Sequence, residues 1–405
     1  MNEVRRVLHV LSGAAGGAAV STIDLIDELG RLGVRSSAVC ASFGTPEEVA
    51  RLADAVGGRL VVVDLFWWNK KLRARRWKRP LIAARDLGRS GWLSKSSRAV
   101  SRFAADQGVD LIHSNTLVVT EGALASRHLG VPHAWHVREM VGPGAPFRFP
   151  FESLSLPTFL RWGADVVVAN SSATAARLPS TTRPIVIPNG VAITPRRERA
   201  HHSGEVVVGM VANLTSTLKK HRLALEAFAL LAPRAPQARL HLIGHDDPTK
   251  PYSAGLRTLA RELGIADKVR FRGFVAPPEA AMSELDILLN PSDSESFGRV
   301  LIEAMASEIP VVSVRAGGAL DIVEDEATGL FTRPDDATEL ANALLRLVSS
   351  PGLRRELGGR ARIRVATHFS LAAHAERVRG AYALAQQRHH ARRSRTTLFG
   401  PRPNA

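Results

Sequence analysis

LDILLNPSDSESFGRVLIEAMASEIPVVSV, residues 285–314, predicts a buried strand, a helix and a second buried strand in succession. The two strands are the short apolar runs Ile287–Leu289 and Pro310–Val314, and residues 291–296 form a turn-rich break after the first. Phe297–Ser307 has the apolar spacing of a helix. The rest of the chain is interpreted outward from this strand, helix, strand unit.

Two glutamates mark the helix of this unit. Glu295 lies in the loop before it and Glu303 lies on it, eight positions later, which is about two helical turns. The backbone amides of Phe297, Gly298 and Arg299 lie between them, at the helix start where anions bind. Two acids around such amides suit a ligand with hydroxyls on either side of an anion, as in a sugar nucleotide. The alternative for Glu303 is an exposed helix charge.

Length and composition set the scale of the molecule. With 405 residues, the chain is expected to form about two domains, and its 45% apolar content is ample for their cores. The chain has 54 Lys and Arg against 38 acids, a formal net charge of +16, which favours a polyanion or an anionic surface as partner. A compositional drift towards arginine explains part of the excess.

Cys40 is the only cysteine, so no intramolecular disulfide and no cysteine-cluster metal site is expected. It lies in the apolar run 37–41, which favours a core position over a nucleophile. The N-terminal residues pass directly into a strand, and no apolar run approaches the roughly 18 residues of a spanning helix. We therefore expect a cytoplasmic protein that holds no metal ion. We also expect that it can touch a membrane but does not cross one.

Strand and helix signals alternate through most of the chain. In the first half a helix is predicted at 19–32, and the strands are 4–11, 34–41, 60–63, 111–113, 133–137, 166–169 and 185–187. In the second half the further strands are 206–211, 240–243, 269–272 and 329–331. Such alternation predicts an α/β fold with two doubly wound lobes, each a parallel sheet covered by helices on both faces.

Breaker-rich and basic segments divide the chain. The run PNGVAITPRRERAHHSG predicts a hinge linker at 188–204, between an N-terminal domain at 1–187 and a C-terminal domain at 205–370. An alanine-rich helix is expected at 371–388, where it could pack back on the N-terminal domain. The basic residues 389–405 are expected to be disordered.

A second basic segment follows the third strand. It combines tryptophans with a run of seven Lys and Arg and no acid, a composition that suits an anionic membrane interface or a polyanionic acceptor. The residues expected on this surface are Trp67, Trp68, Lys70, Lys71, Arg73, Arg75, Arg76, Trp77, Lys78 and Arg79. The alternative is a solvated basic loop with its tryptophans packed inward.

Two loops offer phosphate-binding chemistry. The glycine turn at 13–17 precedes the first helix, but it lacks the G-x-G-x-x-G spacing, and no acid ends the second strand, so NAD is not expected. Lys219 and Lys220 follow the strand at 206–211, beyond the carboxyl end where open α/β sheets bind ligands. They could neutralise a diphosphate, and the alternative is that they are solvated charges in a surface loop.

Together these stretches resemble the retaining nucleotide-sugar glycosyltransferases of the two-lobed GT-B architecture, known as glycosyl transferases group 1. The most specific part is ESFGRVLIEAMA at 295–306, which is similar to the family's signature of two glutamates separated by seven residues. The glycine turn at 12–17, the hinge IPNGV at 187–191, and the glycines at 316–318 and 327–330 resemble further family motifs. The resemblance covers nearly the whole chain and implies two lobes facing a central cleft.

The resemblance also implies roles for particular residues. Glu303 would bind the ribose hydroxyls, Glu295 the hydroxyls of the transferred sugar, and Lys219 the diphosphate. His136 would face the reacting sugar from the N-terminal lobe, although a buried core histidine is the alternative. The other implied donor-binding residues are Gly16, Gly17, Asn213, Lys220, Phe274, Val275, Ser296, Phe297, Gly298, Arg299 and Val300. Asn213 departs from the family pattern, because an arginine usually occupies its position and asparagine lacks the charged fork.

The implied function is transfer of a hexose from a nucleotide diphosphate sugar to an acceptor hydroxyl, with retention and without a cofactor. The acceptor would be a glycan or lipid-linked molecule in cell-envelope polysaccharide or glycolipid synthesis, met at the inner face of the membrane. One alternative is a nucleotide-sugar epimerase of the same fold, against which the signature helix argues. A polyanion- or nucleic-acid-binding protein is the alternative from another class, but no nucleic-acid-binding motif supports it.

Overall fold

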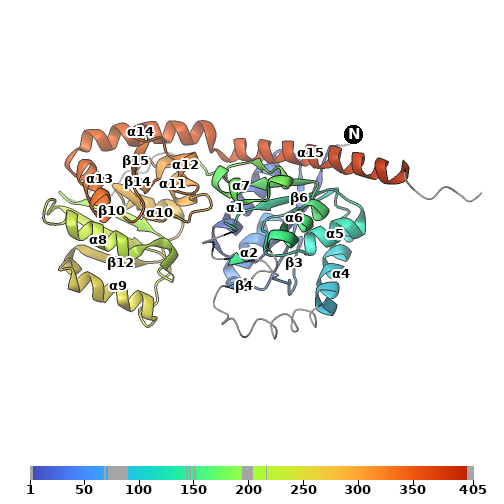
Figure 1. The fold of residues 1–405 in the computed structure, drawn as a ribbon, viewed down its shortest axis with the longest axis horizontal. Helices are drawn as coiled ribbons and strands as arrows, with labels where there is room; N and C mark the ends of the chain where they lie inside the picture. The colour runs from blue at the N-terminus through green and yellow to red at the C-terminus, as the bar shows by residue number, and fades with distance from the viewer. Residues whose placement is uncertain are drawn as a thin grey trace, which may run out of the picture. The chain divides into compact units, whose positions relative to one another are not determined.

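The computed structural model describes residues 3–67, 70–71, 90–142, 145, 147–148, 152–193, 204–215 and 217–398. For residues 70–71, 90–94, 147–148, 152–155 and 395–398 it describes the backbone alone. Contacts divide the chain into two compact units (Figure 1). Unit 1 comprises Met1–Gly190 and Leu371–Ala405, and unit 2 comprises Val191–Ser370.

Unit 1 contains a seven-stranded parallel sheet in the order β3-β2-β1-β5-β6-β8-β9. Its strands are β1 (Arg6–Leu11), β2 (Arg35–Cys40), β3 (Leu60–Val62), β5 (Leu111–Ser114), β6 (His133–Val137), β8 (Val166–Ala169) and β9 (Ile185–Val186). A separate antiparallel pair joins β4 (Lys70–Lys71) and β7 (Phe147–Arg148). The helices are α1 (Gly16–Arg31), α2 (Pro46–Ala55), α4 (Ser90–Asp106), α5 (Glu121–Leu129), α6 (Glu152–Gly163), α7 (Ser172–Arg177), the 3-10 turn η2 (Ser180–Thr182) and α15 (Leu371–Leu398).

Helices cover both faces of this sheet. On one face, apolar residues of α1 and α15 pack with alternate residues of β1, β5, β6 and β8 in one core cluster. On the other, α4 and α5 pack against the remaining residues of β1 and β5, and α6 packs against those of β6 and β8. The continuous apolar strands follow from this double coverage, since a parallel sheet buried on both faces needs no polar face.

Unit 2 contains a six-stranded parallel sheet in the order β12-β11-β10-β13-β14-β15. Its strands are β10 (Val206–Val211), β11 (Ala238–Ile243), β12 (Val269–Gly273), β13 (Ile287–Asn290), β14 (Val311–Val314) and β15 (Gly329–Thr332). The helices and 3-10 turns are η3 (Thr217–Lys219), α8 (His221–Leu231), α9 (Pro251–Glu262), η4 (Ala266–Lys268), α10 (Pro278–Ser283), α11 (Arg299–Ala306), α12 (Ala319–Ile322), α13 (Ala337–Ser349) and α14 (Pro351–His368). Two core clusters fill the two faces of the sheet.

The strand orders locate the ligand edge of each sheet. In both units the first strand, β1 or β10, has a consecutive strand on one side and a later strand, β5 or β13, on the other. Open α/β sheets bind ligands in the crevice at the carboxyl ends of strands where the order reverses. The loops after β1, β10 and β13 therefore lie where the sequence predicts binding residues.

The doubly wound α/β fold is confirmed, and the strands predicted at 133–137, 166–169 and 206–211 match the structure at both ends. Cys40 is buried in the core of unit 1, and burial raises the pKa of its thiol to about 11. The signature helix begins at Arg299, two residues later than predicted, because Gly298 adopts a left-handed φ of 99°. In the described parts of the chain, no helix is long and apolar enough to span a bilayer.

The prediction of a disordered segment from residue 389 is wrong for the part that the structure describes. Helix α15 continues to Leu398 in one run of 28 residues. His389 is buried, with its Nδ1 3.2 Å from Asp165 Oδ2, and Arg392 pairs with Asp165 Oδ1 at 2.6 Å. Composition predicted disorder because it cannot reveal this acid, which lies 224 residues away from His389. Residues 399–405 lie outside the described residues.

Candidate functional site

A lysine and a glutamate meet at the carboxyl edge of unit 2. Lys219 ends η3, after β10, and Glu295 lies in the loop after β13. The Lys219 Nζ lies 2.5 Å from Glu295 Oε1, and the glutamate is 9% exposed while the lysine side chain is 39% exposed. The structure thus places two of the predicted site residues in direct contact, with the ammonium still open to an anion in solvent.

Helix α11 begins in the same loop as Glu295. Gly298 is its N-cap, no side chain hydrogen-bonds the cap, and the first turn contains no acid. The amides of Arg299 and Val300 open the helix, where the positive end of the helix dipole favours an anion. The ring of Phe297 is buried in the core, which fixes the preceding loop in place. An anion can therefore be shared between this helix start and the Lys219 ammonium.

Two glycines after β14 support the Glu295 loop. The Gly318 amide donates to the Glu295 carbonyl at 2.9 Å. A Cβ on Gly317 would lie 2.5 Å from the Glu295 carbonyl oxygen, and one on Gly318 would lie 2.4 Å from Phe297 Cα. Only residues without a side chain allow this approach. The glycines at 316–318, noticed in the sequence as a motif, thus have a physical role in shaping the loop.

The second glutamate of the signature is also paired. Arg299 Nε donates to Glu303 Oε1 at 2.7 Å across one helical turn, and both side chains are about 15% exposed or less. Glu303 lies one helical turn beyond the start of α11, on the same helix as the anion-binding amides. It is therefore a partnered acid near the ligand edge, not an exposed helix charge.

Lys220 has a different environment from Lys219. Its Nζ lies 2.6 Å from Asp293 Oδ2 and 2.7 Å from Asp335 Oδ1. Burial opposes the charged form, but these two hydrogen bonds outweigh it and raise the pKa of Lys220. Its φ of 55° makes it the left-handed N-cap of α8. The two aspartates, which the sequence analysis did not single out, hold Lys220 as part of the scaffold.

Asn213 and two other predicted donor-binding residues, Phe274 and Val275, lie at the ends of neighbouring strands. Asn213 Oδ1 accepts from the His245 amide at 3.0 Å, so this side chain joins the loops after β10 and β11. The His245 ring stacks on Phe274 with centroids 4.3 Å apart and planes 5° from parallel. Phe274 is 61% exposed, and Val275 packs partly buried against the core. His245 was missed, although it follows β11 as Asn213 follows β10.

His136 lies on β6 at the carboxyl edge of unit 1 and is fully buried. Its Nδ1 is 3.4 Å from Arg138 Nη2, and its ring stacks on His113 with centroids 5.5 Å apart. Burial, followed by the nearby charges of Arg138, His113 and His374, lowers the pKa of His136 well below its usual value. Among the described residues, its Nε2 has no hydrogen-bond partner. It is thus a neutral imidazole enclosed by the protein, which fits the alternative of a buried core histidine.

The glycine turn of unit 1 leaves the start of α1 open. Gly16 has a φ of +84°, and a Cβ on Gly16 or Gly17 would meet nothing within 4 Å. No side chain caps α1 at Ala15, and its first turn contains no acid. The start of α1 therefore resembles the start of α11, as an uncapped helix end that a polar or anionic group can approach.

Arg138 ties this edge to the chain that follows β9. It is 6% exposed, and its guanidinium donates to Asn189 Oδ1 at 2.5 Å and to Asn115 Oδ1 at 3.3 Å. Asn189 belongs to the predicted hinge motif. The sequence prediction did not include Arg138. Its position two residues after His136 could have indicated that it lies at the same edge.

Trp67 is the one predicted surface residue whose side chain the structure describes. It pairs with Val119 in an isolated bridge, packs partly buried against a core cluster, and makes an edge contact with Phe43 at 6.2 Å between centroids. Phe43 is 58% exposed and lies against Gly13 of the glycine turn. Lys70 and Lys71 form backbone pairs in β4. The side chains of Trp68, Lys70, Lys71, Arg73, Arg75, Arg76, Trp77, Lys78 and Arg79 lie outside the described ones.

Comparison with known proteins settles the family. The model for glycosyl transferases group 1 matches residues 193–364, and the model for glycosyltransferase family 4 matches residues 15–195. A D-inositol 3-phosphate glycosyltransferase of Stackebrandtia nassauensis is 31% identical over 313 residues, which are 69% of this chain and 69% of that protein. The chain belongs to the group 1 glycosyltransferases.

Other relatives of this chain are also named D-inositol 3-phosphate glycosyltransferases. The D-inositol 3-phosphate glycosyltransferase of Actinosynnema mirum is 33% identical over 228 residues, 49% of this chain and 52% of that protein. The aligned part thus spans about half the length of that relative. Since these relatives are named glycosyltransferases, the epimerase alternative gains no support from them.

Solved structures agree on the GT-B fold of this glycosyltransferase. Anabaena Alr3699/HepE in complex with UDP-glucose has 25% sequence identity and a TM-score of 0.68, covering 96% of this chain and 99% of that chain. A glycosyltransferase from Rickettsia africae has a TM-score of 0.72 at 18% identity, covering 95% of this chain and 99% of that chain. In the described residues, no group of three or more His, Cys, Asp or Glu side chains is arranged to hold a metal ion.

Proposed function

We propose that this glycosyltransferase moves a hexose from a nucleoside diphosphate sugar to an acceptor hydroxyl, with retention at the anomeric carbon. The Lys219–Glu295 pair beside the uncapped start of α11 carries the proposal. It brings one cation from the loop after β10 to one carboxylate and a set of backbone amides after β13, which matches a donor with a diphosphate and a hydroxylated sugar. The UDP-glucose complex of Alr3699/HepE supports a nucleotide sugar as donor class.

The pair would exchange partners when the donor binds. The Lys219 ammonium, 2.5 Å from Glu295 in the protein alone, would turn to the diphosphate. Glu295 would then accept hydrogen bonds from the sugar hydroxyls, while Glu303 would bind the ribose. As the bond between sugar and phosphate breaks, negative charge grows on the diphosphate, and Lys219 with the amides of Arg299 and Val300 would stabilise it.

Unit 1 would hold the acceptor. The open start of α1 at Gly16 and Gly17 would supply backbone donors. His136 is neutral and fully buried, so its Nε2 would contact the reacting sugar only if the residues around it move. The exposed ring of Phe43, braced by Trp67, lies beside this turn and offers an apolar face to a sugar ring or a lipid-linked acceptor. Cell-envelope glycan or glycolipid synthesis at the inner face of a membrane remains the biological setting that we propose.

A donor and acceptor screen tests this function. Release of the nucleoside diphosphate is measured from UDP-, GDP- and ADP-sugars, with and without a panel of glycans, polyprenol-linked sugars and inositol phosphate. We expect one donor to be consumed several times faster when an acceptor is present. Conversion of the donor into an epimer without net release would favour the epimerase alternative, and no turnover with any donor would contradict the proposal.

A further inference from the structure

Almost all of the net positive charge of the chain belongs to unit 1. Unit 1 contains 31 Lys and Arg against 16 Asp and Glu, a formal charge of +15, whereas unit 2 contains 23 against 22, a charge of +1. The excess is therefore not a uniform drift in composition. An anionic partner is therefore expected to meet unit 1.

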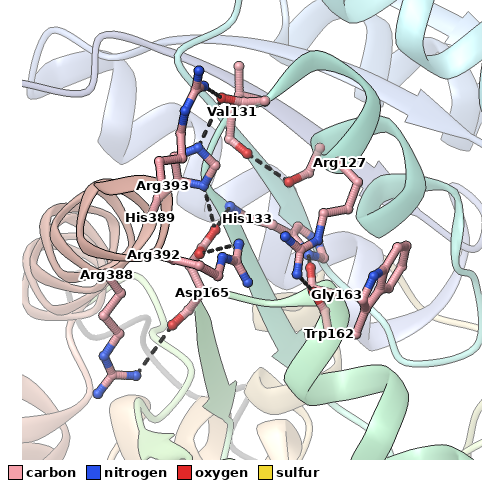
Figure 2. Close-up of polar contacts among 12 residues, drawn as sticks. Arg127, Val131, His133, Trp162, Gly163, Asp165, Arg388, His389, Arg392 and Arg393 are labelled. Carbon is pink, nitrogen blue, oxygen red and sulfur yellow. Dashed lines mark hydrogen bonds and ion pairs between the residues drawn. The ribbon is translucent and has the colours of Figure 1, made fainter. Parts of the chain in front are cut away.

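Three helices bring cations to the amino-terminal edge of the unit 1 sheet. Helix α5 ends before β6 with Arg127, and α6 ends before β8 with Arg161. The last part of α15 lies against the same edge, where the Arg388 guanidinium donates to the Asp165 carbonyl at 3.4 Å and that of Arg393 to the Gly130 carbonyl at 3.0 Å (Figure 2). Cations at helix carboxyl ends complement the helix dipoles, which explains part of this arrangement.

The helix dipoles do not explain the tryptophan among these cations. Trp162, at the end of α6, is 42% exposed. The Arg127 guanidinium lies over the Trp162 ring at 5.1 Å from the centroid and donates to the Trp162 backbone carbonyl (Figure 2). The Phe159 ring packs against the Trp162 ring with centroids 5.4 Å apart. A large apolar ring is thus held at the surface between the Arg127 guanidinium and the Phe159 ring.

We infer that this edge, formed by Arg127, Arg161, Trp162, Arg388, Arg392 and Arg393, docks unit 1 on an anionic lipid bilayer. Indole rings favour the headgroup depth of a bilayer, and arginines nearby attract anionic lipids. The amino-terminal edge of the sheet lies opposite the carboxyl edge, where Gly16 and His136 lie. Docking there leaves the acceptor-side residues of the unit facing away from the bilayer, so the acceptor that fits this orientation is a soluble glycan or the sugar end of a long lipid-linked chain.

The packing of Trp162 favours a bilayer over a nucleic acid. Unpaired bases bind proteins by stacking on the face of an exposed aromatic ring. In this protein Arg127 and Phe159 already pack against the Trp162 ring, so it can enter a lipid headgroup layer more readily than it can stack with a base. The chain also shows no nucleic-acid-binding motif in its sequence.

Vesicle sedimentation with the full chain tests this docking surface. Vesicles of phosphatidylcholine alone are compared with vesicles that contain phosphatidylglycerol as well. We expect binding to the anionic vesicles only, and the pair of substitutions Arg161→Gln and Arg388→Gln to weaken it about twenty- to thirtyfold, since each cation near the surface contributes about fivefold. Trp162→Ala is expected to lower the bound fraction as well. Far-UV circular dichroism verifies that the variants fold.

The matched control removes an exposed cation and an exposed apolar residue from unit 2, with Arg261→Gln and Ile363→Ala, and should bind like the wild type. Absence of binding to anionic vesicles would overturn the inference. Equal binding by the wild type and the Arg161→Gln, Arg388→Gln variant would also overturn it, because another segment would then carry the contact. Binding to duplex RNA is measured in parallel. If the Arg161→Gln, Arg388→Gln variant binds anionic vesicles like the wild type but binds duplex RNA less tightly, the edge serves a nucleic acid and the inference is overturned.

Discussion

Lys219 Nζ lies 2.5 Å from Glu295 Oε1, across 76 positions of sequence, at the carboxyl edge of the unit 2 sheet. The contact joins the loop after β10 to the loop after β13, the two strands at which the strand order reverses. In the protein alone each residue satisfies the other. A donor with both a diphosphate and sugar hydroxyls offers each of them a new partner, so the pair is suited to exchange on binding.

Lys219→Ala should lower the rate of sugar transfer by a factor of about 10² to 10³. The reason is that the Lys219 cation stabilises negative charge that develops only as the bond between sugar and phosphate breaks. The rate is measured at saturating donor, and the thermal unfolding midpoint verifies the fold. Lys250→Ala removes an exposed lysine of the same unit, 3.8 Å from Asp247, and should leave the rate unchanged. A Lys219→Ala enzyme with the wild-type rate would remove Lys219 from the mechanism.

Gly318→Ala should disturb the Glu295 loop, because its Cβ would lie 2.4 Å from Phe297 Cα and the backbone must move. We expect a loss of about 1–3 kcal/mol in unfolding free energy and weaker donor binding, measured by urea denaturation and by titration with donor. Gly359→Ala is the control, since its Cβ meets nothing within 4 Å on α14 and it should be neutral or slightly stabilising. Similar effects of both substitutions would refute the proposed role of this turn.

Acid should destabilise unit 1 through its buried histidines. Burial, aided by Arg138, lowers the pKa of His9 to about 3, burial lowers that of His133 to about 4, and burial lowers those of His113 and His136 well below the usual value. The unfolded chain, with histidine pKa values near 6.5, takes up protons first as the pH falls. Stability is therefore fully present above about pH 6.5 and is lost below it.

This pH dependence is measured as the midpoint of urea unfolding of unit 1 between pH 8 and pH 5. The fluorescence of the tryptophans in that unit reports the unfolding. The midpoint should stay nearly constant down to about pH 7 and then decline, with the steepest change below about pH 6.5. His136 should also show no titration near pH 6.5 by NMR. A midpoint that rises as the pH falls would reverse the sign of the argument.

Asp165→Asn should loosen the end of α15. The carboxylate, 2% exposed, pairs with Arg392 at 2.6 Å and with His389 at 3.2 Å, and breaking a buried pair costs about 3–5 kcal/mol. Hydrogen exchange should then increase at 386–394. The control is Asp110→Asn, which removes a more exposed salt bridge, to Arg6 at 3.1 Å. It should leave the amides of α15 protected from hydrogen exchange. Unchanged exchange in Asp165→Asn would show that α15 is held by its apolar contacts alone.

The fold followed from local patterns in the sequence. The apolar runs at 133–137 and 206–211 are strands in the structure. Because both faces of each sheet are buried, such strands are continuously apolar, and this pattern can be recognised in the local sequence alone. The motif around Glu295 and Glu303 likewise predicted a loop and a helix that the structure contains.

The contacts made by the site residues could not be predicted in the same way. The pairing of Lys220 with Asp293 and Asp335, and of Asp165 with His389, joins residues 73 to 224 positions apart. Such pairs depend on which loops the sheet order brings together, and nothing in a single sequence reports them. The disorder prediction for 389–398 was wrong for this reason, since a basic helix is stable where a buried acid meets it.

Calorimetric titration of the full chain with UDP, GDP and ADP tests the central claim most directly. We expect one diphosphate to bind, and both Lys219→Ala and Glu303→Ala to weaken it by about tenfold or more, since each removes a charge-assisted hydrogen bond to the ligand. Lys250→Ala should bind it like the wild type. Binding of none of the three nucleotides, or equal affinity in the wild type and both site variants, would contradict the account.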